Sequence, residues 1–66
     1  MARETTAALV VIGNEILSGK VADSNSTFLA QQLRAVGVSL CRIVVVPDDV
    51  AVIAETVRTL APAVDV

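Results

Sequence analysis

The sequence predicts an α/β fold of three layers, α/β/α, in which helices cover a mostly parallel sheet. Continuous apolar runs alternate with amphipathic segments in the order β-α-β-α along the 66 residues. Apolar residues make up 55% of the chain and only one residue is aromatic, which suits an aliphatic core. Such alternation joins parallel strands by right-handed crossovers. We expect residues 1–66 to be the N-terminal part of a single domain, truncated after β-α-β-α and the start of a third strand.

The two expected strands are apolar runs that end at a turn-forming residue. Residues 7–12 read AALVVI and stop at Gly13; such runs are typical of strands buried on both faces of a parallel sheet. Residues 39–46 form the second strand, whose β-branched run 43–46 should also be fully buried. Pro47 ends it because proline has no N–H for the ladder. Cys41 within this strand should be a buried, inert thiol.

The first expected helix begins with Ser24 or Asn25 as its N-cap and runs to about Val36. Gly37 is well placed to end it. Residues 13–23, which precede this helix, are expected to form a loop. The apolar face of the helix consists of Leu29, Leu33 and Val36, with Phe28 beside them.

The second expected helix begins at Asp48 and Asp49 and stops at Pro62. One carboxylate can cap it, and both lie at the favourable end of the helix dipole. Residues 64–66 then resemble the opening of a third strand. The apolar stripe of this helix consists of Val50, Ile53, Val57 and Leu60.

Composition restricts the class of protein. The net charge is −2 with no basic stripe, which argues against a nucleic-acid partner. The apolar run near the N-terminus has six residues, too few to cross a membrane. There is no histidine and one cysteine, so the segment holds no structural zinc site and no Ser–His or Cys–His pair. We expect a soluble, cytoplasmic protein whose small core is completed by further chain or by a partner.

Two segments follow the expected strands and should share one rim, because ligands bind beyond the carboxyl ends of parallel strands. They are residues 13–20 and 47–49. The first is not a phosphate loop, since five residues separate Gly13 from Gly19 and Val21 follows Lys20. It is either a plain connection whose apolar side chains pack inward or a ligand loop.

The Asp48-Asp49 pair also has two compatible interpretations. The pair can cap the following helix. As a site, adjacent carboxylates can hold a divalent cation or accept hydrogen bonds from a pterin ring. Glu15 is a weaker candidate for the same rim.

Four segments carry a resemblance to a known family: IGNEILSG at 12–19, DSNS at 23–26, FLAQQL at 28–33 and VPDD at 46–49. Their order and spacing resemble the molybdopterin-binding domain shared by molybdenum-cofactor biosynthesis proteins and the competence/damage-inducible protein A (CinA) family. The CinA branch is the more similar one. The chain departs from the pattern at Asn14, where members often carry Asp, and at Pro47, where they often carry Gly.

The resemblance implies a ligand, which is molybdopterin or a nucleotide, and a homo-oligomer. In the CinA branch it implies metal-dependent hydrolysis of nucleotide pyrophosphates such as ADP-ribose. In the molybdenum-cofactor branch it implies binding of molybdopterin, which some members also adenylylate. A related domain is fused to FAD synthase in eukaryotes. The alternatives are a binding module without chemistry or an inactive fragment, because the family's Gly-Gly-x-Gly-Pro-Thr loop would come after the third strand.

The site residues that the resemblance implies fall into two groups. Asp48 is the expected catalytic residue, and Asp48 and Asp49 are the expected metal ligands. The expected ligand-binding residues are Gly13, Asn14, Glu15, Ser18, Gly19 and Asn25.

Overall fold

The computed structural model describes residues 4–66, which form an α/β unit. Strand β1 (Thr5–Ile12) leads through the single helical turn α1 (Asn14–Leu17) to helix α2 (Ser24–Ala35). Strand β2 (Val38–Val46), helix α3 (Val50–Leu60) and the short 3-10 turn η1 (Ala61–Ala63) follow. The predicted order β-α-β-α is confirmed, and α1 is an addition within the segment expected to be a loop.

The two strands lie side by side and parallel, and they form the centre of the molecule. The last residues of the chain run along the other edge of β1. There the Val66 N–H donates to the Thr6 carbonyl and the Ala8 N–H donates to the Val66 carbonyl, both at 3.0 Å. This is the bonding pattern of a parallel neighbour. Residues 64–66 therefore lie where a third strand would begin, with β1 between them and β2.

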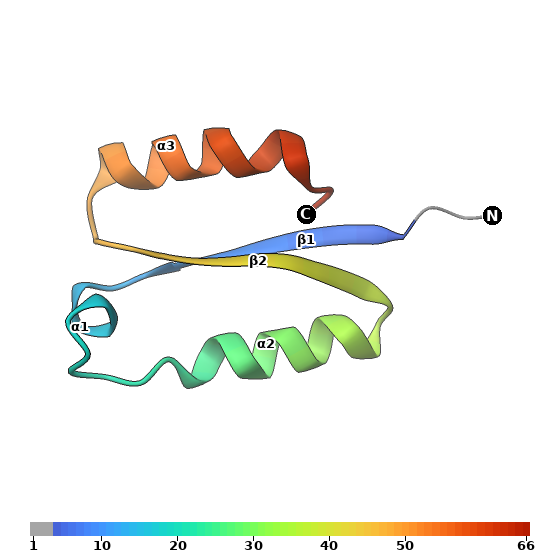
Figure 1. Ribbon diagram of the computed structural model, residues 1–66, viewed down its shortest axis with the longest axis horizontal. Helices are drawn as coiled ribbons and strands as arrows, with labels where there is room; N and C mark the ends of the chain where they lie inside the picture. Colours follow the sequence, from blue (N-terminus) through green and yellow to red (C-terminus); the bar gives the residue numbers. More distant parts are fainter. Residues whose placement is uncertain (1–3) are drawn as a thin grey trace.

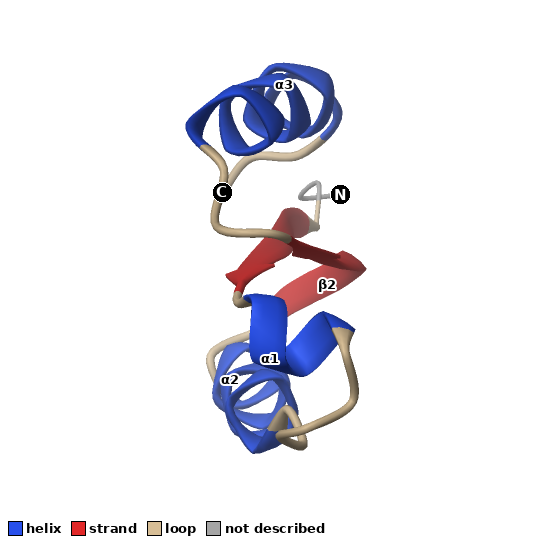
Figure 2. Ribbon diagram, turned by 90° about the vertical axis from the view of Figure 1, so that its left-hand side faces the viewer, coloured by secondary structure: helices blue, strands red, loops and turns tan. Residues whose placement is uncertain are grey.

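Helices cover both faces of the sheet. Figure 1 shows α2 on one side of the strands and α3 on the other, and the end-on view in Figure 2 separates the three layers. Both crossovers join parallel neighbours through a helix, as the predicted α/β/α architecture requires. Along residues 4–66, no helix is both long and apolar enough to cross a membrane.

Local capping explains where the helices begin and end. The Asp23 carboxylate accepts the Ser26 backbone N–H at 3.1 Å and also the Ser26 hydroxyl, so the N-cap of α2 is Asp23 and not the predicted Ser24 or Asn25. Gly37 has φ +82°, a left-handed conformation that ends α2 as predicted. α3 ends at Leu60, and Pro62 lies in the 3-10 turn that follows it.

The buried core of the described chain is small. Three apolar residues of the described chain are buried: Ala7, Val46 and Leu60. The expectation of strands buried on both faces is wrong for much of both strands. A two-stranded sheet is narrower than the helices that cover it, so side chains at the strand edges and on the outer parts of the helices stay exposed. Two of the residues predicted for the helix stripes, Val36 and Val50, are 75% and 83% exposed. The radius of gyration, 13.0 Å, exceeds the value of about 11 Å expected for a compact chain of this length.

β2 contains a bulge that corrects the interpretation of Cys41. Ala7 pairs with Leu40 and Ala8 pairs with Arg42, so Cys41 is an extra residue with no partner on β1. Its thiol is free and exposed rather than buried. The predicted full burial of the following run is also wrong for most of it, since Ile43 is 45% exposed, Val44 and Val45 are half-buried, and only Val46 is buried.

Candidate ligand-binding rim

The segments that follow β1 and β2 meet at one end of the sheet. The Gly13 N–H donates to the Val46 carbonyl at 3.0 Å, which extends the ladder by one bond. The Asp48 N–H donates to the Asn14 side-chain oxygen at 3.2 Å. Figure 1 shows α1 and the start of α3 at this same end. We call residues 13–19 together with residues 47–49 the carboxyl-end rim.

The first part of the rim is a folded turn rather than an open loop. Backbone bonds close α1: Leu17 donates to the Gly13 carbonyl at 3.3 Å and Ser18 to that of Asn14 at 3.0 Å. The Ser18 hydroxyl also donates to the Glu15 carbonyl at 3.1 Å. Gly19 then turns the chain with φ +81°. Ser18 and Gly19 therefore shape the turn, and their ligand contacts stay a prediction.

Gly13 is buried and its surroundings leave little room for a side chain. A Cβ at this position would lie 3.3 Å from the Glu15 carboxylate oxygen and 3.4 Å from Ile16 Cδ1. The Glu15 side chain thus folds back over the end of β1, with its carboxylate at the rim. The sequence places Glu15 on the rim only as a weak candidate, and this contact gives it a defined position there.

Of the two adjacent aspartates, only Asp49 caps the following helix. The Asp49 carboxylate accepts the Ala51 and Val52 N–H groups at 2.9 and 3.2 Å and caps α3. The capping interpretation is therefore confirmed for Asp49. Asp48 is exposed, and within residues 4–66 its carboxylate makes no hydrogen bond or ion pair, while its N–H is held by Asn14.

Asn25, the last of the predicted ligand residues, lies in helix α2. It belongs to the first turn of α2, which covers the opposite face of the sheet from α3. The neighbouring Asp23 has its pKa held below the ordinary value of 3.8, first by the hydrogen bond from the Ser26 hydroxyl and then by that from the Ser26 N–H. Asp23 was not among the predicted site residues, and its role here is to cap α2.

The donor atoms at the rim fit a hard cation in type but are few. Carboxylate oxygens of Asp48 and Asp49 are the ligands that Mg²⁺ prefers. Among residues 4–66, however, no three acidic, cysteine or histidine side chains come together closely enough to hold a metal ion. Any cation at this rim would therefore keep water or ligand oxygens as its remaining ligands.

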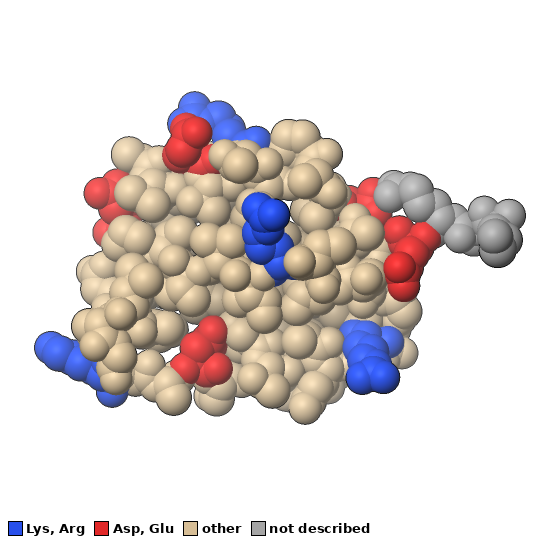
Figure 3. All heavy atoms as spheres, viewed as in Figure 1, with Lys and Arg blue, Asp and Glu red and all other residues tan. Residues whose placement is uncertain are grey.

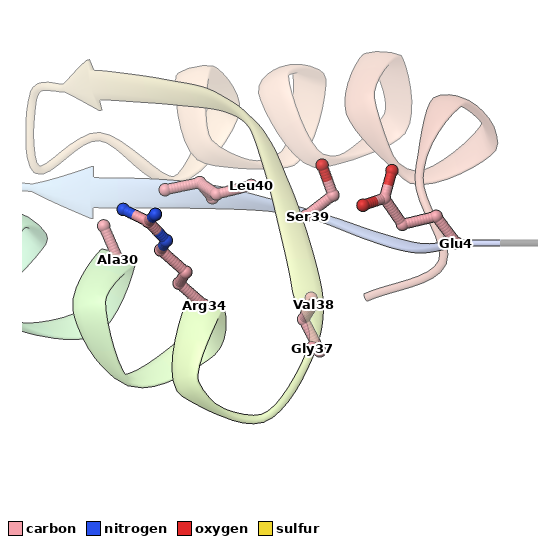
Figure 4. Close-up of a pocket in the computed structure, with 7 residues that line it drawn as sticks. All are labelled: Glu4, Ala30, Arg34, Gly37, Val38, Ser39 and Leu40. Atoms are coloured by element: carbon pink, nitrogen blue, oxygen red, sulfur yellow. The ribbon is translucent and has the colours of Figure 1, made fainter.

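Three hollows of the described surface have no rim residue in their lining. One of about 450 Å³ opens at the amino end of β2 and is shown in Figure 4. A second of about 140 Å³ lies between β1 and α3, and a third of about 240 Å³ between β2 and α3. On the face seen in Figure 3 the charged side chains are scattered, without a patch of one sign. None of these three hollows is lined by residues 13–19 or 47–49.

A parallel sheet with helices on both faces, and polar loops gathered at the carboxyl ends of its strands, defines the class of open α/β ligand-binding domains. Within this class the sequence is specific. Residues 8–66 match the family model described as "Probable molybdopterin binding domain". The chain belongs to this family, and the resemblance drawn from the four segments is confirmed.

Relatives of two kinds are similar to the chain. A "Probable FAD synthase" of Caenorhabditis elegans is 42% identical over 65 residues, which cover 98% of the chain and 12% of the relative. A "CinA-like protein" of Thermotoga maritima is 39% identical over 59 residues, or 89% of the chain and 14% of the relative. A "CinA-like protein" of Colwellia psychrerythraea is 36% identical over 58 residues, which cover 88% of the chain and 13% of the relative. The chain thus spans about an eighth of the length of these relatives.

Proposed function

We propose that the carboxyl-end rim binds the pterin or the phosphates of a molybdopterin- or nucleotide-type ligand, as the membership of the family suggests. The observation that carries this proposal is the hydrogen bond between Asn14 Oδ1 and the Asp48 N–H. It ties the two strand-end loops together and leaves the Asp48 carboxylate with no partner in the described part of the chain. A free, positioned carboxylate at this edge can accept hydrogen bonds from the amino and ring N–H groups of a pterin.

The finer proposal is that the protein cleaves a nucleotide pyrophosphate such as ADP-ribose. This proposal rests on the resemblance to the CinA family, and two CinA-like proteins are among the similar relatives. Asp48 and Asp49 would hold a divalent cation, which supplies charge neutralisation at the phosphates when bound. Asp49 can do so through the carboxylate oxygen that does not cap α3, since Oδ1 takes both capping bonds. Asn14 would position Asp48 by fixing its backbone.

Hydrolysis of ADP-ribose in the presence of Mg²⁺ tests the finer proposal. We expect turnover to fall at least about 100-fold in Asp48→Asn, which keeps the shape and removes the charge. Asp49→Asn preserves the helix cap, since Asn caps as well as Asp, so a loss there reports on the cation. Glu4→Gln removes an exposed carboxylate elsewhere and should retain full activity. Undiminished turnover in Asp48→Asn would remove Asp48 from the reaction.

The second candidate is a module that holds molybdopterin without chemistry, which the description of the family favours. It shares the rim with the first candidate and differs only in the outcome. Saturable binding of molybdopterin, with no turnover of a nucleotide pyrophosphate in any divalent cation, would select this function. The FAD synthase relatives add a flavin nucleotide to the ligands worth testing.

A further inference from the structure

The side-chain amide of Asn14 has a fixed orientation at the carboxyl-end rim. Its Oδ1 accepts the Asp48 backbone N–H at 3.2 Å. A backbone N–H can only donate, so the oxygen of the amide faces it and the nitrogen, Nδ2, faces away from it. Asn14 is exposed, and Nδ2 donates to no acceptor among residues 4–66. The rim therefore offers a ligand the donors of an amide whose other end is already held.

The Asp48 carboxylate places acceptors beside these donors. It makes no hydrogen bond or ion pair with any of residues 4–66, and an ionised carboxylate offers only acceptors, one on each oxygen. The N–H that Asn14 holds belongs to the same residue as this carboxylate, so the amide and the carboxylate are neighbours on the rim. Together they present a pair of acceptors next to a donor.

We propose that Asn14 and Asp48 together select a ring with an amino-oxopyrimidine edge, which pterin and guanine share. This inference rests on the proposed function, which places the ligand at the rim. The edge carries an amino group, a ring N–H and a carbonyl oxygen in a row. The Asp48 carboxylate accepts from the first two groups, and Asn14 Nδ2 donates to the carbonyl oxygen. Asn14 is thus a specificity-determining residue, in addition to holding the backbone of Asp48.

Adenine does not match this pair of residues. In the position that guanine would take, its amino group would face Asn14 Nδ2, which is also a donor. Its ring nitrogen, an acceptor, would face the Asp48 carboxylate, which is also an acceptor. A ring bound in this way leaves the polar groups of the site unpaired, and such a mismatch is strongly rejected. A substrate such as ADP-ribose would therefore contact the rim through its pyrophosphate and not through its adenine.

Titration calorimetry with GMP and AMP tests the selection, because the two nucleotides share ribose and phosphate and differ only in the base. The wild type should bind GMP at least about tenfold more tightly than AMP. Asn14→Asp keeps an acceptor for the Asp48 N–H but replaces the donor, so this preference should fall at least about tenfold. The added charge acts on both phosphates alike and cancels in the ratio. Equal binding or no binding of the two nucleotides by the wild type, or an unchanged preference in Asn14→Asp, would overturn the proposal.

Titration with molybdopterin separates this inference from the proposed function. Asn14→Asp and Asp48→Asn should each weaken its binding about tenfold, and the distant Glu4→Gln should bind as the wild type does. A loss in Asp48→Asn alone would leave the ligand at the rim and remove Asn14 from its recognition. No loss in either variant would contradict the proposed function as well. The tighter of the two ligands, molybdopterin or GMP, identifies whether a pterin or a guanine nucleotide supplies the edge.

Discussion

Asp49→Ala should destabilise the protein by removing the cap of α3. The Asp49 carboxylate satisfies two N–H groups, those of Ala51 and Val52, at 2.9 and 3.2 Å. Loss of such a cap costs about 1 kcal/mol of unfolding free energy. In a chain of this size that corresponds to roughly 4–8 °C in Tm. The effect is a large part of the few kcal/mol that so small a core supplies.

Urea unfolding followed by far-UV circular dichroism measures this loss, with two matched controls. Asp49→Asn keeps a capping oxygen and should lie within about 0.3 kcal/mol of wild type. Asp48→Ala removes the neighbouring carboxylate, which caps nothing, and should have a similarly small effect. Equal losses in Asp49→Ala and Asp48→Ala would refute the assignment of the cap to Asp49.

Three further predictions concern the turns and the rim. Because the folded pKa of Asp23 is lowered, its carboxylate stabilises the fold above pH 3.8, and this contribution is lost as the pH falls through the folded pKa. The difference in unfolding free energy between wild type and Asp23→Ala should therefore shrink over that pH window. A pH-independent difference would contradict this role. Gly37→Ala should cost about 1 kcal/mol in urea unfolding from the left-handed backbone alone, since a Cβ there meets nothing within 4 Å; a neutral effect would argue against the positive φ. Asn14→Ala should lower the unfolding free energy by about 0.5 kcal/mol, because it removes the acceptor for the Asp48 N–H. Asn14→Asp should not, because its carboxylate can still accept this bond. Equal losses in the two variants would contradict this role of Asn14.

The architecture is predictable from the sequence because it depends on patterns of short range. The apolar runs that end at Gly13 and Pro47 define the strands, and the residues that end or cap helices, Gly37 and Asp49, have local requirements of backbone geometry and hydrogen bonding. These features act within a few residues, so one sequence suffices to recognise them. The helical turn α1 escapes this reasoning because its four residues make only about one turn, so no apolar spacing can repeat within it.

Burial and strand edges are less predictable because they depend on neighbours far along the chain. Cys41 lies within a predicted strand, yet it falls at a bulge of β2 and is exposed. Val50 fits the spacing of an apolar stripe but lies at the exposed start of α3. The rim is intermediate: parallel topology brings its two loops together, but only the structure shows that Asn14 holds the Asp48 N–H and that Asp49 is the residue that caps α3.

The central claim is that the carboxyl-end rim binds the ligand, and a binding titration tests it most directly. Fluorescence titration of the protein with molybdopterin under anaerobic conditions should give saturable binding at one site per chain. The double variant Asn14→Ala/Asp48→Asn should bind at least about tenfold more weakly, a loss of about 1.4 kcal/mol, while the distant Glu4→Gln should bind as wild type does. Binding that is unchanged in the double variant would place the ligand elsewhere and contradict the account.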